Sequence, residues 1–85
     1  MTVPEAMLAA IADELARARA KFPQQDVWVT LAALTEEVGE LNQAILQRAY
    51  QAAEKNVTVA HIRKEAVQVA VMALRVALDC NVEAL

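Results

Sequence analysis

A chain of 85 residues has room for one domain, residues 1–85, which can bury only roughly 60–65% of the surface that the unfolded chain exposes. The net charge of −3, from 8 basic and 11 acidic residues, argues against a nucleic-acid polymer or a membrane surface as a partner. The single Cys80 excludes an intrachain disulfide framework. The chain shows neither a signal-peptide pattern nor an apolar run that could cross a bilayer, so we expect a cytoplasmic protein.

Apolar residues make up 58% of the chain, above the usual share of about 45–50%, and only one glycine and two prolines interrupt it. This composition predicts long helices with more apolar surface than one small bundle can hide. A symmetric partner is the simplest cover for the surplus. We therefore expect an all-α, three-helix protomer that assembles into a four-helix-type bundle as a homo-oligomer, either a dimer or a tetramer.

The first helix is predicted to begin near Val3 or Pro4. Thr2 and Glu5 have the spacing of a capping box, and proline is tolerated in a first helical turn. Pro23 disfavours helical conformation at the residue before it, so the helix should end within the segment that contains it.

The second helix is predicted from about Val27 to about Ala53, with Asp26 as its N-cap. Its apolar residues step by three and four positions and form one narrow seam. The seam consists of Leu31, Leu34, Val38, Leu41 and Ile45.

The third helix is predicted from about Val59 to about Asp79 or Cys80, with Thr58 as its N-cap. At about 100° per residue it is apolar on two sides, with a thin polar stripe between them. One side holds Ile62, Val69, Ala73 and Val76, the other holds Val67, Val71, Leu74 and Leu78, and the stripe holds His61, Lys64, Gln68, Arg75 and Asp79. We expect one side to be covered by the same chain and the other by a second chain.

Three carboxylates lie within five residues of the second helix, at Glu36, Glu37 and Glu40. Like charges at these helical spacings repel one another, and an ordinary solvated face is the plain interpretation. Gly39, the only glycine, lies inside this group, although glycine in a helix costs about 1 kcal/mol relative to alanine. Glu65 borders the apolar surface of the third helix and would face these glutamates across the turn. Such a cluster suits Mg²⁺, which prefers oxygen ligands.

The segment Trp28–Leu41 resembles the signature helix of the MazG-like pyrophosphohydrolases, an all-α superfamily that includes dimeric dUTPases and phosphoribosyl-ATP pyrophosphohydrolase. Its members split nucleoside triphosphates into monophosphate and pyrophosphate, using Mg²⁺ held by an EExxE motif and a later ExxD motif. The resemblance covers the second and third helices. In the later motif Glu65 matches the glutamate, whereas Gln68 replaces the aspartate and removes one negative charge. The segment 64–70 also resembles a MazG-like subgroup that carries this glutamine.

The resemblance implies Mg²⁺ as the cofactor, with Mn²⁺ as a possible substitute, and a nucleotide as the substrate. The implied metal ligands are Glu37, Glu40, Glu65 and the carbonyl oxygen of Gln68. Glu36 is implied to be either a further ligand or the catalytic base.

Three other side chains are candidates for substrate binding. Trp28 could stack on a nucleobase, although an aromatic residue at a helix start more often belongs to a core. Lys64 and Arg48 could meet phosphate oxygens, although most surface charges do nothing specific. Cys80 is interpreted as a small buried hydrophobe, and His61 with Glu65 as a surface pair.

Three hypotheses remain open at this stage. The first is an active, Mg²⁺-dependent nucleoside triphosphate pyrophosphohydrolase. The second is a non-catalytic module of the same fold that binds a nucleotide or a partner protein, and Gln68 favours it. The third is a helical assembly element that binds no ligand.

Overall fold

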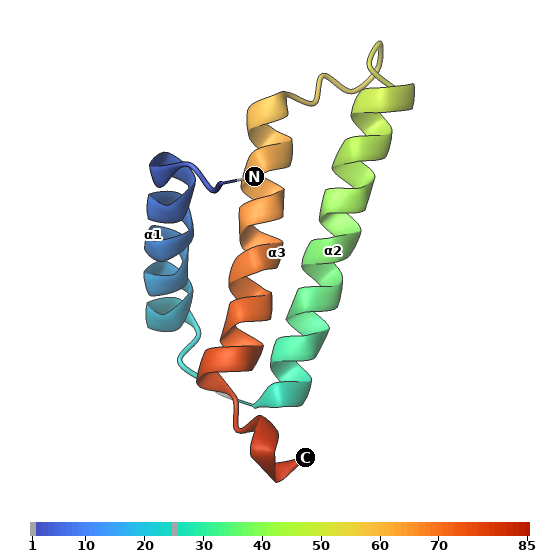
Figure 1. Cartoon of the computed structure of the whole chain (residues 1–85). Coiled ribbons are helices and arrows are strands. Elements are labelled where there is room, and N and C mark those ends of the chain that lie inside the picture. Colours follow the sequence, from blue (N-terminus) through green and yellow to red (C-terminus); the bar gives the residue numbers. More distant parts are fainter. Residues whose placement is uncertain (1, 25) are drawn as a thin grey trace.

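The computed structural model describes residues 2–24 and 26–85 (Figure 1). It contains three α-helices, α1 (Glu5–Lys21), α2 (Val27–Tyr50) and α3 (Val59–Asp79), followed by the short 3₁₀ helix η1 (Val82–Ala84). No strand occurs among the described residues, so the all-α prediction is confirmed. A search of the described residues for a helix long and apolar enough to cross a membrane finds none.

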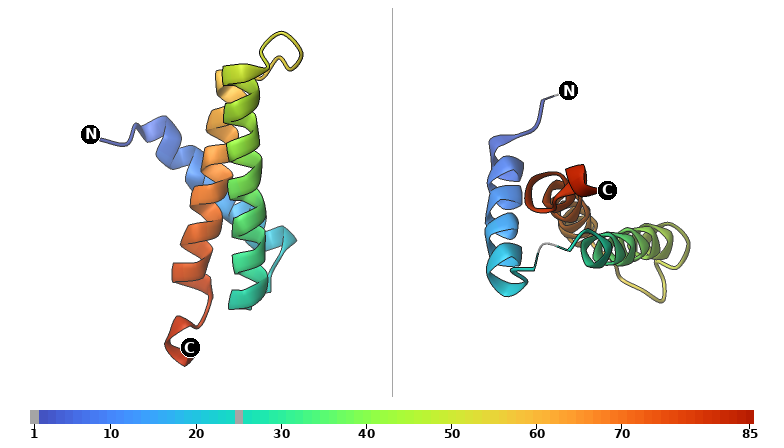
Figure 2. Two further views of the ribbon diagram at one scale, coloured as in Figure 1. Left: turned by 90° about the vertical axis from the view of Figure 1, so that its right-hand side faces the viewer. Right: turned by 90° about the horizontal axis from the view of Figure 1, so that it is seen from below.

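Helix α3 lies in the middle of the protomer, between α1 and α2 (Figure 1). Helices α2 and α3 run side by side in opposite directions, whereas α1 crosses α3 at an angle (Figure 2). The molecule is elongated, with dimensions of 47 × 28 × 26 Å. Helix α3 therefore has two neighbours within the same chain, but Ala73, Leu74 and Leu78 on its apolar sides remain exposed.

Two of the predicted helix caps are confirmed. The Asp26 carboxylate accepts hydrogen bonds from the backbone N–H groups of Trp28, at 2.8 Å, and Val29, at 3.2 Å. The Thr58 hydroxyl accepts one from the N–H of His61 at 3.0 Å. Each cap satisfies N–H groups that have no partner inside the first turn, which fixes where α2 and α3 begin.

The capping box predicted for the first helix is wrong. Helix α1 begins at Glu5, and Pro4 occupies the N-cap position without a side-chain cap. The Pro4 carbonyl instead accepts from the N–H groups of Met7 and Leu8, each at 3.0 Å, and Thr2 lies outside the helix.

Helix α2 is three residues shorter than predicted, because it ends at Tyr50 rather than near Ala53. Its C-cap residue, Gln51, donates its N–H to the carbonyl of Gln47. The chain then turns back toward α3, and Arg48 donates from Nη1 to the carbonyl of Val57 at 2.8 Å, closing the turn.

The predicted apolar seam of α2 is only partly covered within the protomer. Leu34 and Leu41 are half-buried, but Leu31, Val38 and Ile45 remain exposed. The fully covered residues of α2 are Thr30 and Ala44. These two lie about 100–140° around the helix from Leu31, so α2 meets α3 along a line that is rotated from the seam.

The polar stripe of α3 lies partly inside the protein rather than facing solvent. Arg75 is 2% exposed and is one of the largest fully buried side chains, and Gln68 is half-buried. A buried arginine requires hydrogen-bond acceptors for its donors, since an unpaired buried charge is costly.

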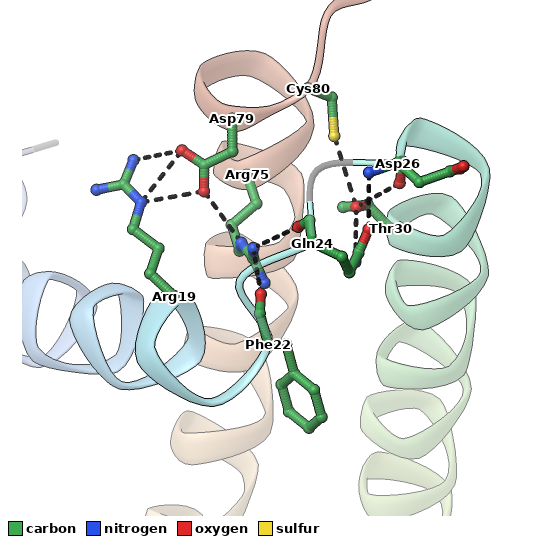
Figure 3. A network of polar contacts seen from close by, with 8 residues as sticks. All are labelled: Arg19, Phe22, Gln24, Asp26, Thr30, Arg75, Asp79 and Cys80. Atoms are coloured by element: carbon green, nitrogen blue, oxygen red, sulfur yellow. Dashed lines mark hydrogen bonds and ion pairs between the residues drawn. The ribbon is translucent and has the colours of Figure 1, made fainter.

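The acceptors for Arg75 come from the connection between α1 and α2 (Figure 3). Nη2 donates to the carbonyls of Phe22 and Gln24, at 2.7 and 3.0 Å. Nε donates to Asp79 Oδ2 at 3.0 Å, and Arg19 of α1 donates to the same carboxylate. These cations, Arg19 first, hold the pKa of the Asp79 carboxyl below its usual range. The network ties α1, the connection and α3 together.

The same network continues to the start of α2. The Thr30 hydroxyl donates to the carbonyl of Asp26 at 2.8 Å and accepts from the Cys80 thiol at 3.5 Å. Cys80 is buried, as predicted from the sequence. The two connections at this end of the molecule are thus held to one another by side-chain hydrogen bonds.

We predict that Arg75→Met will lower the free energy of unfolding by about 2–4 kcal/mol, because two backbone carbonyls and a carboxylate lose a buried donor. Urea unfolding followed by far-UV circular dichroism measures the change. The matched control is Arg63→Met, an exposed arginine on the same helix, which should change the stability by no more than about 0.5 kcal/mol. Equal stability of the two variants would contradict a stabilising role for the network.

Candidate functional site

Helices α2 and α3 bring three glutamates together. The side chains of Glu37 and Glu40 from α2 and of Glu65 from α3 each offer a carboxylate oxygen within 4.8 Å of the other two. Glu65 is only 9% exposed, Glu37 is half-buried and Glu40 is exposed. The predicted approach of Glu65 to these α2 glutamates is confirmed.

Gln68 joins this acidic cluster as a hydrogen-bond donor. Its side-chain amide nitrogen lies 3.1 Å from Glu37 Oε2 and 3.1 Å from Glu65 Oε2. The nitrogen is assigned to this position because both neighbouring atoms can only accept, so an amide oxygen there would be repelled. The amide therefore bridges the two helices. To act as a metal ligand, Gln68 would have to turn its amide so that the oxygen faces the cluster.

Burial and repulsion by its neighbours disfavour ionisation of Glu37. Partial burial is the largest cause that raises the pKa of Glu37, followed by the negative charges of Glu40 and Glu65. A hydrogen bond to Glu40 and the charge of Glu14 act in the same direction. The folded protein thus holds a carboxylate at Glu37 that would gain from a nearby cation.

Helix α1 places an ion pair beside the cluster. Arg17 donates from Nε to Glu14 Oε2 at 2.8 Å, and this hydrogen bond is the main reason that the pKa of Glu14 is lowered. The charges of Lys64 and Arg17 lower it further. On the third helix, His61 Nε2 lies 3.6 Å from Glu65 Oε1.

A cleft of about 330 Å³ opens next to the acidic cluster, between α1, α2 and the connection that joins them, with α3 as its floor. Its polar lining includes Glu36, Glu37 and Gln68, with Arg17 on the opposite wall. Its apolar lining consists of Ala18, Phe22, Val29, Ala33, Val71 and Met72. An apolar cleft with a few polar groups along one edge is typical of a small-molecule site.

A second cleft, of about 430 Å³, lies between α1 and the first half of α3. Arg63 and Lys64 line it, and Glu14, Arg17 and Gln68 line both clefts. The two clefts therefore meet where the ion pair of α1 approaches Gln68.

The predicted substrate-binding residues lie at different distances from this region. Lys64 lines the second cleft. Trp28 is 67% exposed and belongs to the lining of neither cleft, about 13 Å along α2 from Glu37. Arg48 lies about 12 Å along α2 from Glu40, and its guanidinium closes the turn to α3. The structure thus brings Lys64, but neither Trp28 nor Arg48, beside the clefts.

Sequence reasoning missed the residues that α1 contributes. Glu14 and Arg17 have the spacing of a helical ion pair, but this spacing is common on surfaces and points to no site. Their importance comes from how α1 crosses α3, which depends on the buried Arg75 network rather than on any local pattern.

The donor set of the acidic cluster fits a hard divalent cation. Glu37, Glu40 and Glu65 offer carboxylate oxygens from two facing helices, and such oxygens are the ligands that Mg²⁺ and Mn²⁺ prefer. Acidic side chains also gather on protein surfaces without an ion, and the response of the melting temperature to Mg²⁺ distinguishes these two cases.

We predict that Glu37→Gln will raise the melting temperature by a few degrees at neutral pH in metal-free buffer. Because the pKa of Glu37 is raised in the folded protein, its ionised form disfavours folding, and a neutral amide removes that penalty. As the pH falls through the raised pKa, wild-type Glu37 becomes protonated and the difference should shrink. Thermal unfolding from about pH 7 to pH 4 with EDTA measures it. A Glu36→Gln control tests the exposed neighbour, and a difference that is independent of pH would contradict the assignment.

We predict that Gln68→Asp will lower the melting temperature in EDTA, because a fourth carboxylate replaces an amide that donates to two of the others. Millimolar Mg²⁺ should then raise the melting temperature of this variant more than that of the wild type, since a cation that binds only the folded state stabilises it. Gln51→Asp, at the end of α2, is the control and should show the wild-type response to Mg²⁺. A response of Gln68→Asp no larger than that of the control would show that the cluster does not hold the ion.

No family model, curated protein or solved structure matches the chain. The resemblance described above therefore rests on the residues of α2 and α3 that carry it.

Proposed function

We propose that the protein hydrolyses nucleoside triphosphates, standard or modified, to monophosphate and pyrophosphate in the presence of Mg²⁺ or Mn²⁺. The observation that carries this proposal is the meeting of Glu37, Glu40 and Glu65 from two helices at the edge of a cleft of about 330 Å³. In this proposal the three carboxylates hold the metal ion. Gln68 positions Glu37 and Glu65 through its amide.

The bound ion would supply positive charge to a triphosphate that the acidic cluster alone would repel. Glu36 lines the cleft beside Glu37, and it is the proposed general base. It accepts a proton from a water molecule as the water oxygen forms a bond to phosphorus. The phosphoanhydride bond between the α- and β-phosphates then breaks, and pyrophosphate leaves with the bonding electrons.

Positive side chains border the same region. Arg17 lines both clefts, and Lys64 lines the second. In the proposal they bind the outer phosphates, with the nucleoside against the apolar lining. The working form is proposed to be a homo-oligomer, a dimer or a tetramer.

A second proposal is a non-catalytic module of the same fold that binds a nucleotide or a partner protein. The observation that favours it is the Gln68 amide, which donates to Glu37 and Glu65 and so relieves part of the repulsion that a metal ion would otherwise relieve. Because these hydrogen bonds relieve part of the repulsion between the carboxylates, a bound cation would stabilise the cluster less.

Pyrophosphate release from a panel of standard and modified nucleoside triphosphates tests the first proposal. With Mg²⁺ or Mn²⁺ we expect release by the wild type and a loss of at least about a hundredfold in Glu40→Gln, because removing a metal-ligand charge weakens both metal binding and charge stabilisation. Gln43→Glu, one turn away on the same helix, is the control and should retain activity. Absence of release from every substrate, by a protein shown to be folded, would refute the first proposal and leave the module.

A further inference from the structure

The protomer exposes more surface than a folded chain of its mass should. A monomer of 9.3 kDa is expected to expose about 5,000 Å², whereas this chain exposes 6167 Å². The radius of gyration of 14.4 Å also exceeds the value of about 12 Å expected for 85 residues. The excess of about 1,200 Å² is larger than the area of about 800 Å² that each partner buries in a standard protein interface.

The charges of α2 are confined to one half of the helix. Its four charged residues are Glu36, Glu37, Glu40 and Arg48. At 100° per residue they fall within an arc of about 120°, on the side that borders the cleft and α3. The rest of the circumference carries no charge along the whole 24-residue helix.

The uncharged side that points away from α3 is rich in exposed apolar residues, and we call it the α2 outer face. Its exposed large side chains are Trp28, Leu31, Val38, Ile45, Leu46 and Tyr50. Leu31, Val38 and Ile45 are each close to half exposed and recur every seven residues, the spacing at which two helices pack along a shared seam. Exposed Thr35 and Asn42 interrupt these apolar side chains, but no charge does, and a large exposed apolar surface is unusual on a monomer.

Gly39 lies halfway along α2 but toward the edge of the outer face, about 100° around the helix from Val38 and about 60° from Glu36 on the charged side. A Cβ atom placed on it would meet no described atom within 4 Å, so nothing inside the protomer requires a glycine there. Glycine in mid-helix is unfavourable, yet it lets a second helix backbone approach closely. A glycine beside the outer face therefore leaves room for a second copy that packs along the seam.

We propose that the α2 outer face is the surface through which two copies of this chain associate, along the seam of Leu31, Val38 and Ile45. A second copy fits better than a partner of another chemistry because an uncharged face offers nothing for a charged partner to pair with, while it can pack on itself without burying a charge. The excess area per chain also meets what each half of a two-fold dimer must bury.

This inference specifies the surface of the proposed homo-oligomer and is independent of the proposed chemistry. The charged half of α2, with Glu36 and Glu40, points away from the outer face, so the cleft remains accessible in the assembly. Assembly can therefore be measured without nucleotide or metal, and its failure would leave the enzymatic proposal to its own test.

Sedimentation velocity of the full chain, from about 1 to 100 µM, tests the proposal. The wild type should sediment as two or more chains. Val38→Lys and Ile45→Lys should each raise the dissociation constant by at least about tenfold, because a lysine ammonium would be buried against an apolar partner. Both residues are nearly half exposed in the protomer, so circular dichroism should show that the helices remain. Leu8→Lys, at an equally exposed leucine of α1, is the control and should sediment as the wild type.

A second measurement needs no substitution on the interface. Trp28 is the only tryptophan and lies exposed on the outer face, so its fluorescence emission should shift to longer wavelength when dilution separates the copies. Gly39→Leu should weaken the assembly while leaving the protomer folded, since a side chain there has free space inside the protomer.

The proposal would be overturned if the wild type were monomeric, or if both lysine variants kept the wild-type mass. It would also be overturned if Leu8→Lys dissociated the protein equally. A tryptophan emission that stays constant while dilution separates the copies would contradict it as well.

Discussion

The buried guanidinium of Arg75 is the constraint on which the arrangement of the helices depends. Its donors cannot remain unpaired away from water, and the acceptors that satisfy them are two backbone carbonyls of the connection between α1 and α2. Holding that connection against the end of α3 directs α1 along one side of the central helix and α2 along the other (Figure 3). The cleft beside the glutamates exists because α1 and α2 are kept apart in this way.

The repulsion within the acidic cluster destabilises the fold that this network stabilises. Glu37, Glu40 and Glu65 lie close enough to repel one another, and partial burial makes the Glu37 carboxylate harder to ionise. Replacing these carboxylates by neutral side chains would stabilise the protein. A contribution to stability therefore does not account for their presence. Gln68 relieves part of the repulsion by donating to two of the three carboxylates. The same residue thus explains how the protomer tolerates the cluster and why the two functional proposals differ in their need for a cation.

Much of the fold could be predicted from local sequence signals. Asp26 and Thr58 cap their helices with short-range hydrogen bonds, so the starts of α2 and α3 followed directly from residue type and position. The convergence of Glu65 on Glu37 and Glu40 also followed, because an antiparallel helix pair with a short turn brings those positions level. The capping box predicted from Thr2 was wrong, because the Pro4 carbonyl accepts from the first N–H groups of α1 and no side-chain cap forms.

What could not be predicted depends on contacts between residues distant in sequence. The burial of Arg75 depends on carbonyls more than fifty positions away, so its place in the polar stripe of α3 could not show that its side chain is buried. The crossing of α1, and with it the position of Arg17 beside the clefts, depends on the same long-range contacts. The exposed half of the α2 seam could not be foreseen either, because periodicity shows that residues share a face but not which neighbour covers that face.

The scarcity of fully buried side chains has a consequence for a newly made chain. The largest of them are Arg75, Val71 and Thr30, two of which are polar, so a single protomer gains little from the removal of apolar surface from water. Under the proposed association through the α2 outer face, the stability of the protein depends on how many copies are present. In that proposal, the first chains synthesised in a cell keep their apolar helix surfaces open to chaperones and proteases, and their lifetime increases as the number of copies grows.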